Sequence, residues 1–152
     1  LLVVLACTVK NLNKTVITIM SLVSIASVMN YAGMIGVIAS ALVAATGVYY
    51  PLFVPLIGAI GTFVTGSDTS SNILFGKLQA NVASQLSYPD PNWLVSANTA
   101  GATGGKIISP QSIAIATASC NMPGRDGEIL RSALPYAIGY IILAGLMVYF
   151  AC

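Results

Sequence analysis

Long apolar stretches without charged residues alternate with short polar segments along the chain. Residues 16–48 carry no charge, and as one helix they would reach about 50 Å, against about 30 Å for the hydrocarbon core of a bilayer. This stretch must therefore tilt or break, and a kink is expected near residues 30–36. There, Asn30 competes for backbone hydrogen bonds, and Gly33 and Gly36 lower helix propensity. Interfacial aromatic rings and a helix stop are expected to close the stretch at Tyr49, Tyr50 and Pro51.

Residues 52–86 follow as two short arms around a polar tip. The first arm, residues 52–65, is apolar but has only 14 residues, a length typical of re-entrant segments. Residues 65–72 are nearly all small or polar, and residues 73–86 return with apolar side chains at helical spacing. The pattern predicts a re-entrant hairpin that enters and leaves the bilayer on the same side.

Residues 94–119 are the next candidate for a membrane span, and an interruption is expected within them. The glycine-rich residues 99–106 are not expected to hold a regular helix. A fresh helix is expected to start at Ser109, as the N-cap, with Pro110 at its first position. The remaining segments are a charged loop and a final span, at residues 121–131 and 132–152.

The composition turns this pattern into a fold class. Of the 152 residues, 57% are hydrophobic and 7% are charged, and the mean hydropathy is +0.88. An ordinary soluble domain has about 25% charged residues. Six Lys or Arg and four Asp or Glu residues are too few to cover a globule in water. We therefore expect an all-α polytopic membrane protein with transmembrane helices, broken helices and a re-entrant hairpin.

The same composition excludes much chemistry. The chain has no histidine, so it cannot by itself build a Ser-His-Asp triad, a Cys-His nucleophile or a histidine zinc site. Its three cysteines form no C-x-x-C pair, which favours inert buried thiols. A net charge of +2 without a basic stripe argues against nucleic-acid binding. We expect neither a cofactor nor a metal site, and no enzymatic activity.

Two polar interruptions, residues 65–72 and 99–106, are the expected substrate site. Unwound backbone in hydrocarbon is costly unless protein, water or a ligand satisfies it. A half-helix N-terminus follows each interruption and suits a small anion such as a carboxylate. Paired broken helices also mark the substrate sites of secondary transporters. Asp68 and Lys106 are the ionisable residues within the two interruptions.

Each of these candidates also has a structural interpretation. Asp68 could cap a helix that begins near Ser71, and Lys106 could extend to a membrane interface. Polar contacts between helices are the alternative role for four further residues: Asn98, Thr99, Ser109 and Gln111.

Four sequence runs resemble the bacterial L-lactate permease family. The longest is FVTGSDTSSNILFG at residues 63–76. The other three agree with the family in order and spacing: MNYAGM at 29–34, ANTAG at 97–101 and GKIISPQSIAIA at 105–116. Alanine stands at residues 32 and 100, where the resemblance leads us to expect a small polar residue such as serine.

The resemblance covers nearly all of residues 16–150 and implies a multi-pass carrier in the bacterial plasma (inner) membrane. Its expected substrates are lactate and related 2-hydroxy monocarboxylates such as glycolate, carried together with protons. Family members are several times longer, so the chain would correspond to roughly the C-terminal third and would work with the remaining N-terminal part. The chain also begins at Leu1 without a methionine or a signal-peptide layout, which favours a fragment.

The physical chemistry of the residues suggests which of them bind the proton and which bind the carboxylate. Asp68 is expected to accept the coupling proton, because a dry site favours the neutral form of a carboxyl group. Lys106 and the helix N-termini near Ser71 and Ser112 are expected to hold the carboxylate. The full set of candidate substrate-binding residues is Lys106, Ser109, Gln111, Asn98, Thr69, Ser71, Asn72 and Ser112.

Two other functions remain open at this stage. In a sodium-coupled carboxylate carrier, Asp68 and exposed carbonyl groups would bind the cation. In a membrane scaffold without transport activity, the Gly, Ser and Thr stretches would only pack helices closely.

Overall fold

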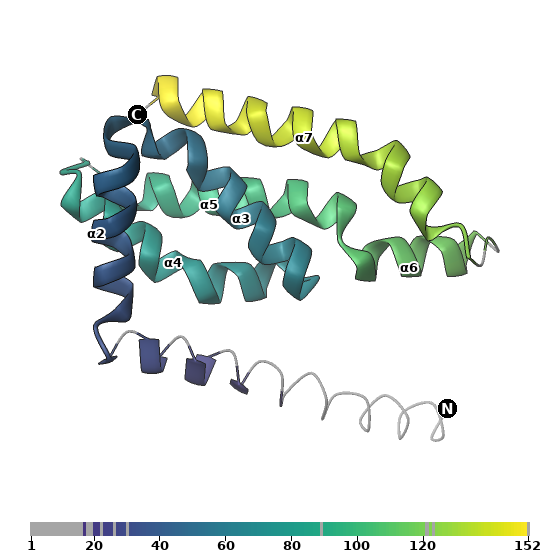
Figure 1. Cartoon of the computed structure of the whole chain (residues 1–152), viewed down its shortest axis with the longest axis horizontal. Coiled ribbons are helices and arrows are strands. Elements are labelled where there is room, and N and C mark those ends of the chain that lie inside the picture. The colour runs from purple at the N-terminus through teal and green to yellow at the C-terminus, as the bar shows by residue number, and fades with distance from the viewer. Residues whose placement is uncertain are drawn as a thin grey trace.

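The computed structural model describes residues 17, 20–21, 23–25, 27–29, 31–88, 90–120, 122 and 124–151. All regular secondary structure among them is helical, which confirms the all-α expectation (Figure 1). The elements are α2 (Met34–Thr46), the 3-10 helix η1 (Gly47–Tyr49), α3 (Tyr50–Thr65), α4 (Asp68–Gln85), α5 (Pro91–Ile108), α6 (Pro110–Ser119) and α7 (Asp126–Ala151).

The chain turns just before α2, within the stretch where the first break is expected. Ala32 and Gly33 form a turn, and Gly33 has a φ of 72°, a left-handed conformation that glycine adopts without a steric cost. Asn30 lies outside the described residues.

The helix stop expected at residues 49–51 falls a few residues earlier. α2 ends at Thr46, and Gly47, with a φ of 53°, bends the chain into η1 and then α3. Pro51 lies in the first turn of α3, where a missing N–H group breaks no hydrogen bond. Tyr50 is completely buried rather than interfacial, whereas Tyr49 is exposed and stacks on Tyr149.

α3 and α4 form a helical hairpin with a tip much shorter than expected (Figure 1). Only Gly66 and Ser67 separate the two helices, and residues 68–72, expected in the polar tip, form the start of α4. The Ser67 hydroxyl accepts a hydrogen bond from the Ser70 N–H group at 3.3 Å, so Ser67 is the N-cap. Asp68 is therefore the first residue of the helix and does not act as its cap.

The expectation that residues 99–106 are unwound is wrong, because α5 is continuous through them. The glycines there allow close helix packing. A Cβ atom at Gly101 would lie 1.9 Å from the Pro55 carbonyl oxygen, and one at Gly105 would lie 2.1 Å from the Ala59 carbonyl oxygen. Small residues four positions apart let two helix backbones approach in this way. Packing against α3 thus outweighs the weak helix propensity of glycine.

The break in this part of the chain falls later, at Ser109, between α5 and α6. Ser109 has an extended backbone, and its side chain accepts a hydrogen bond from the Ser112 N–H group at 3.3 Å. Pro110 follows as the first residue of α6. The helix start expected from Ser109 and Pro110 is therefore confirmed.

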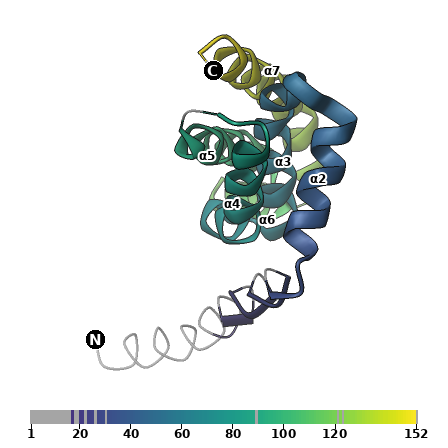
Figure 2. The ribbon, with the colours of Figure 1, turned by 90° about the vertical axis from the view of Figure 1, so that its left-hand side faces the viewer.

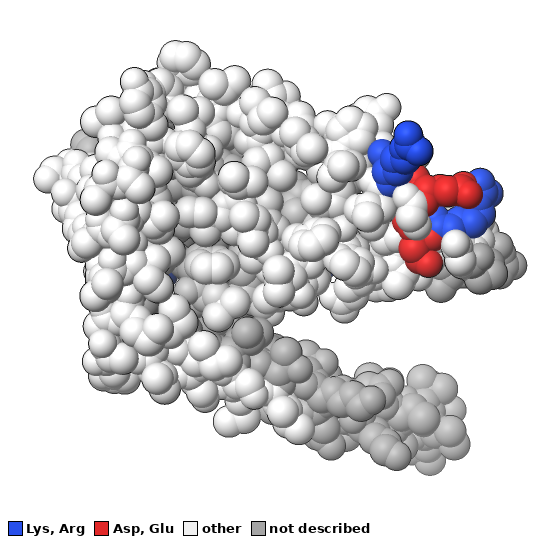
Figure 3. All heavy atoms as spheres, viewed as in Figure 1, with Lys and Arg blue, Asp and Glu red and all other residues white. Residues whose placement is uncertain are grey.

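The last helix begins earlier than expected. α7 starts at Asp126, so part of the expected charged loop is helical. Asp126 and Glu128 lie in its first turn, where the helix dipole favours negative charge, and Arg125 forms an ion pair with Glu128. Charged side chains gather at this end of the molecule, where α6 meets α7, and leave the rest of the visible face almost uncharged (Figure 3).

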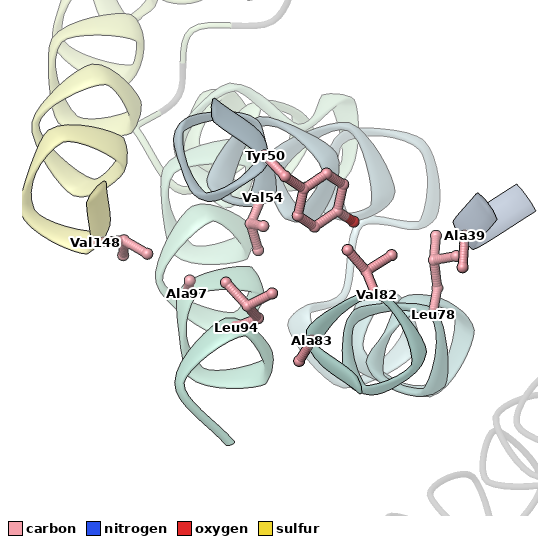
Figure 4. Close-up of a cluster of buried hydrophobic side chains, with 9 residues drawn as sticks. All are labelled: Ala39, Tyr50, Val54, Leu78, Val82, Ala83, Leu94, Ala97 and Val148. Carbon is pink, nitrogen blue, oxygen red and sulfur yellow. The ribbon is translucent and has the colours of Figure 1, made fainter. Parts of the chain in front are cut away.

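In the described part of the chain, two helical segments are long and apolar enough to cross a membrane, Gly36–Thr65 and Asp126–Ala151. α3, α4 and α5 pack together, with α2 and α7 on the outside of this group (Figure 2). A buried cluster joins five of the helices, and in it Tyr50 points from α3 toward α4 (Figure 4). The cluster comprises Ala39, Tyr50, Val54, Leu78, Val82, Ala83, Leu94, Ala97 and Val148.

Candidate functional site

The two helix breaks meet in space. The Lys106 ammonium, near the end of α5, donates a hydrogen bond of 2.8 Å to the carbonyl oxygen of Gly66, at the end of α3. The Gln111 side chain, from the first turn of α6, lies against the same glycine, because a Cβ atom at Gly66 would be 2.1 Å from Gln111 Oε1. We call the group formed by Gly66, Ser67, Lys106, Ser109 and Gln111 the junction.

The local sequence explains the shape of the junction. Gly66 has a φ of 70°, and glycine is the residue that ends a helix in this conformation most readily. The last carbonyl groups of a helix have no partner within it and carry the negative end of its dipole. Lys106 supplies both a hydrogen-bond donor and a positive charge at that point. Its side chain thus stabilises the end of α3.

An open pocket of about 390 Å³ lies beside the junction, between α5, α6 and α7. Lys106 and Ser112 contribute polar groups to its wall, together with Thr103. The remaining lining residues are apolar: Ile107, Ile113, Ala116 and Ile129. A small apolar molecule with one charged end would match this lining.

Asp68 lies at the start of α4, next to the junction in sequence. Its Oδ1 atom is buried and has no hydrogen-bond partner among the described residues. The Thr62 hydroxyl, in the last turn of α3, is buried in the same unpartnered state. These are the two buried side-chain polar atoms without a partner in the described part of the chain. A buried oxygen without a donor is costly, and a proton or a ligand would relieve that cost.

A chain of mostly buried polar side chains connects the helices on which the junction is built. The Tyr50 hydroxyl donates to Gln79 Oε1 at 2.7 Å, and Gln79 Nε2 donates to Asn98 Oδ1 at 3.3 Å. Asn98 Nδ2 donates to Asn72 Oδ1 at 2.9 Å, and the Thr99 hydroxyl lies 3.2 Å from the same oxygen. Tyr50, Gln79 and Asn98 are completely buried. This chain, which we call the amide chain, links α3, α4 and α5.

The structure separates the expected site residues into groups. Lys106, Ser109, Gln111 and Ser112 come together at or beside the junction. Asn72 and Asn98 belong to the amide chain. Ser71 is completely buried and donates to the Gly58 carbonyl oxygen at 2.9 Å, whereas Thr69 is exposed.

Sequence reasoning missed Tyr50 and Gln79. Tyr50 has the position of an interfacial ring next to Pro51, so its sequence context pointed outward. Gln79 carried a usable signal, because Asn72 and Gln79 are seven residues apart and so share one face of α4.

The chemistry available at this site is that of anion binding. One ammonium group, the N-termini of α4 and α6, and neutral amides and hydroxyls surround this region, and the Asp68 carboxyl group stands at the start of α4. Among the described residues, no three His, Cys, Asp or Glu side chains gather closely enough to hold a metal ion.

These features define a class: a helical protein with candidate membrane spans, in which two interrupted helices meet at their breaks. The chain belongs to the L-lactate permease family, whose model, described as L-lactate permease, matches residues 1–152. The members of this family are permeases, which are polytopic membrane transport proteins rather than enzymes.

Individual relatives agree with this assignment. The chain is 43% identical to the glycolate permease GlcA of Escherichia coli over 144 residues, which is 95% of the chain and 25% of that protein. It is 40% identical to the L-lactate permease of Escherichia coli over 140 residues, or 92% of the chain and 25% of that protein. For the L-lactate permease of Bacillus subtilis the identity is 38% over 142 residues, or 93% and 25%.

The chain thus spans about a quarter of the length of these relatives, rather than the expected third. No solved structure matches it.

Proposed function

We propose that this chain forms part of a secondary carrier that moves lactate and related 2-hydroxy monocarboxylates, such as glycolate, across the bacterial plasma membrane together with a proton. Family membership and the names of the relatives support the substrate class. The observation that carries the site is the junction, where Lys106 bridges the two helix breaks. The other three quarters of such a carrier would complete the site, so the chain alone is not expected to transport.

Lys106 holds the substrate carboxylate in this proposal. An ammonium group has three donors, and the described contacts use one of them, on the Gly66 carbonyl. The others are free for an anion in the neighbouring pocket, whose wall includes Lys106 and Ser112. Hydrogen bonds between charged partners are stronger than neutral ones, and the dipole at the start of α6 adds to the attraction.

Other polar residues near the junction have supporting roles. Gln111 and Thr69 are exposed and can reach a substrate, whereas Ser109 is buried and caps α6. Ser71 and Asn98 are completely buried with their polar groups engaged, so they support the site by holding their neighbours. Asn72 is half-buried and remains accessible.

Asp68 carries the coupled proton. Moving a lactate anion alone against an inside-negative potential costs about 2.3 kcal/mol per 100 mV, and a proton carried with it removes this cost. The buried Asp68 Oδ1 has no donor among the described residues, so protonation adds no conflict with an existing hydrogen bond.

We place the hairpin of α3 and α4 as a re-entrant element. α3 has 16 residues and would extend about 24 Å, less than the hydrocarbon thickness of about 30 Å. Its tip is buried within the protein, because Gly66 is buried and its carbonyl group has a partner. Irregular backbone at membrane depth is tolerated under this condition.

Uptake of radiolabelled lactate into proteoliposomes that contain the complete carrier tests the proposal. A pH gradient, acid outside, should drive lactate accumulation. Asp68→Asn should preserve the exchange of lactate for lactate and abolish accumulation. Asp90→Asn is the matched control, since Asp90 is exposed and caps α5, a role that asparagine also fills.

Accumulation by Asp68→Asn would refute the proton role. Replacement of sodium by choline should leave uptake unchanged, and a loss of uptake would make sodium the coupling ion. Absence of lactate uptake by the unaltered carrier would refute transport of this substrate.

A further inference from the structure

We propose that Asn72 recognises the 2-hydroxyl group of the substrate and that the amide chain is the device that orients it. This inference rests on the proposed function, because it assigns a contact to the same substrate. Asn72 is then a specificity-determining residue. Tyr50, Gln79 and Asn98 are positioning residues that act through it without touching the substrate.

The amide chain has a direction. At each step a donor group of one side chain meets an oxygen atom of the next, beginning with the Tyr50 hydroxyl and passing through Gln79 and Asn98. Primary amides donate through nitrogen and accept through oxygen, so the orientation of one amide determines that of its neighbour. The last acceptor in the chain is Asn72 Oδ1.

Asn72 Oδ1 accepts from α5. It receives a hydrogen bond from Asn98 Nδ2 at 2.9 Å and lies 3.2 Å from the Thr99 hydroxyl, whose single proton is shared with the Val95 carbonyl oxygen, also at 3.2 Å. Rotating the Asn72 amide by half a turn would turn its NH₂ group toward the NH₂ group of Asn98. That would leave a buried donor without an acceptor, at a cost of about 1–3 kcal/mol. Reversing the amides of Asn72, Asn98 and Gln79 together would instead leave the buried Tyr50 hydroxyl proton without its acceptor, so the described contacts favour one orientation.

The orientation leaves Asn72 Nδ2 as an outward donor. Asn72 is half-buried, and none of its described contacts uses Nδ2. Asn72 lies four residues after Asp68, so the two side chains are neighbours on one face of α4. A substrate that reaches Asn72 is thus beside the residue proposed to carry the proton.

A neutral donor suits the hydroxyl group better than the carboxylate. Lys106 supplies the positive charge that a carboxylate needs, and Thr103, which lines the same pocket, lies one helical turn after Thr99, the residue of α5 that contacts Asn72. The 2-hydroxyl group is neutral and can accept a hydrogen bond from an amide. Sites that hydrogen-bond a substrate hydroxyl discriminate against analogues that lack it, because their donor is then left unpaired.

The first test compares lactate with propionate, which lacks the hydroxyl group, as competitors of lactate uptake by the complete carrier in proteoliposomes. Asn72→Ala should reduce the preference for lactate over propionate about ten-fold, with propionate inhibition unchanged. Tyr50→Phe removes the hydroxyl that begins the amide chain and should reduce the same ratio by a smaller factor. Asn81→Ala is the control, because Asn81 is exposed on α4 and bonds only within its own helix.

A second test addresses the direction of the amide chain. Asn72→Asp retains an acceptor for Asn98 and Thr99 and replaces the outward donor with an acceptor. The 2-oxo group of pyruvate can only accept a hydrogen bond, whereas the hydroxyl group of lactate can also donate one. Asn72→Asp should therefore weaken inhibition by pyruvate more than it weakens binding of lactate.

The outcomes separate this inference from the function on which it rests. A lactate-to-propionate ratio that is unchanged in Asn72→Ala, or an equal loss for both acids, would overturn the role of Asn72. Equal losses of lactate and pyruvate in Asn72→Asp would overturn the assigned direction, and this variant keeps the acceptors that the fold requires. Failure of the unaltered carrier to take up lactate would instead refute the proposed function.

Discussion

The Lys106 ammonium reaches across 40 residues of sequence to donate a hydrogen bond of 2.8 Å to the Gly66 carbonyl oxygen. This contact joins the end of α3 to the end of α5, so two helices that are interrupted separately share one point. A ligand that attracts Lys106 therefore acts on both breaks. Such a point is a natural place for substrate binding to be coupled to movement of the α3–α4 hairpin.

Replacement of this lysine tests its role directly. Lys106→Gln should raise the KM for lactate by about ten- to a hundred-fold, since hydrogen bonds to charged groups contribute about 1.5–3 kcal/mol. The dependence of uptake on lactate concentration measures this effect. Lys77→Gln, which removes an exposed lysine from α4, should leave the KM unchanged. An unchanged KM in Lys106→Gln would remove this residue from the carboxylate site.

The close packing of α3 and α5 predicts a sharp contrast between two glycines. Gly101→Ala should lower the free energy of unfolding by about 1–3 kcal/mol, because the new Cβ atom would lie 1.9 Å from the Pro55 carbonyl oxygen. Gly76→Ala in α4 meets no atom within 4 Å and should stabilise its helix by up to about 1 kcal/mol. Thermal unfolding of the purified carrier in detergent measures both. Equal effects would contradict the described packing.

The unpartnered hydroxyl of Thr62 predicts that its removal raises the free energy of unfolding. Thr62→Val keeps the shape of the side chain and removes a buried group without a partner, so stability should rise by about 1 kcal/mol. Thr117→Val is the contrasting variant, since the Thr117 hydroxyl donates to Asp126 Oδ1 at 2.8 Å. Its free energy of unfolding should fall by about 1.5–3 kcal/mol, the range for a hydrogen bond to a charged group. A loss of stability in Thr62→Val would show that its hydroxyl has a partner.

The contact between Gly66 and Gln111 predicts a coupling between them. Gly66→Ala should be destabilising, because the position has a φ of 70° and its Cβ atom would lie 2.1 Å from Gln111 Oε1. Gln111→Ala removes the obstructing oxygen. The double variant should therefore be more stable than the sum of the single effects predicts, by about 0.5–3 kcal/mol. Strict additivity in thermal unfolding would mean that the two breaks do not meet at this point.

Local signals in the sequence were enough to predict the helices and several of the residues at which they begin or end. Gly33 marks a turn because it adopts a left-handed conformation. Ser109 with Pro110 marks a helix start because the serine hydroxyl accepts from the Ser112 N–H group and the proline has no N–H group that needs a partner. Both effects depend on residues close in sequence. The resemblance to the family also required only the order and spacing of short runs.

Interactions between distant segments decided the rest. Gly101 and Gly105 suggest a broken helix when α5 is considered alone, and they became sites of backbone contact because α3 covers them. The sequence around Tyr50 suggested an interfacial ring. In the fold the ring is buried, because Gln79 of α4 accepts a hydrogen bond from its hydroxyl group. In each case the outcome depends on a neighbour that is remote in sequence.

By itself, the sequence determined that this protein is a helical membrane protein of the L-lactate permease family, because scarcity of charge and local motifs are properties of the chain alone. The tertiary structure decided that the two breaks meet at Gly66 and that Asn72 ends a buried chain of amides. Those relationships depend on which helix faces bury one another, and packing settles that only once the helices have come together.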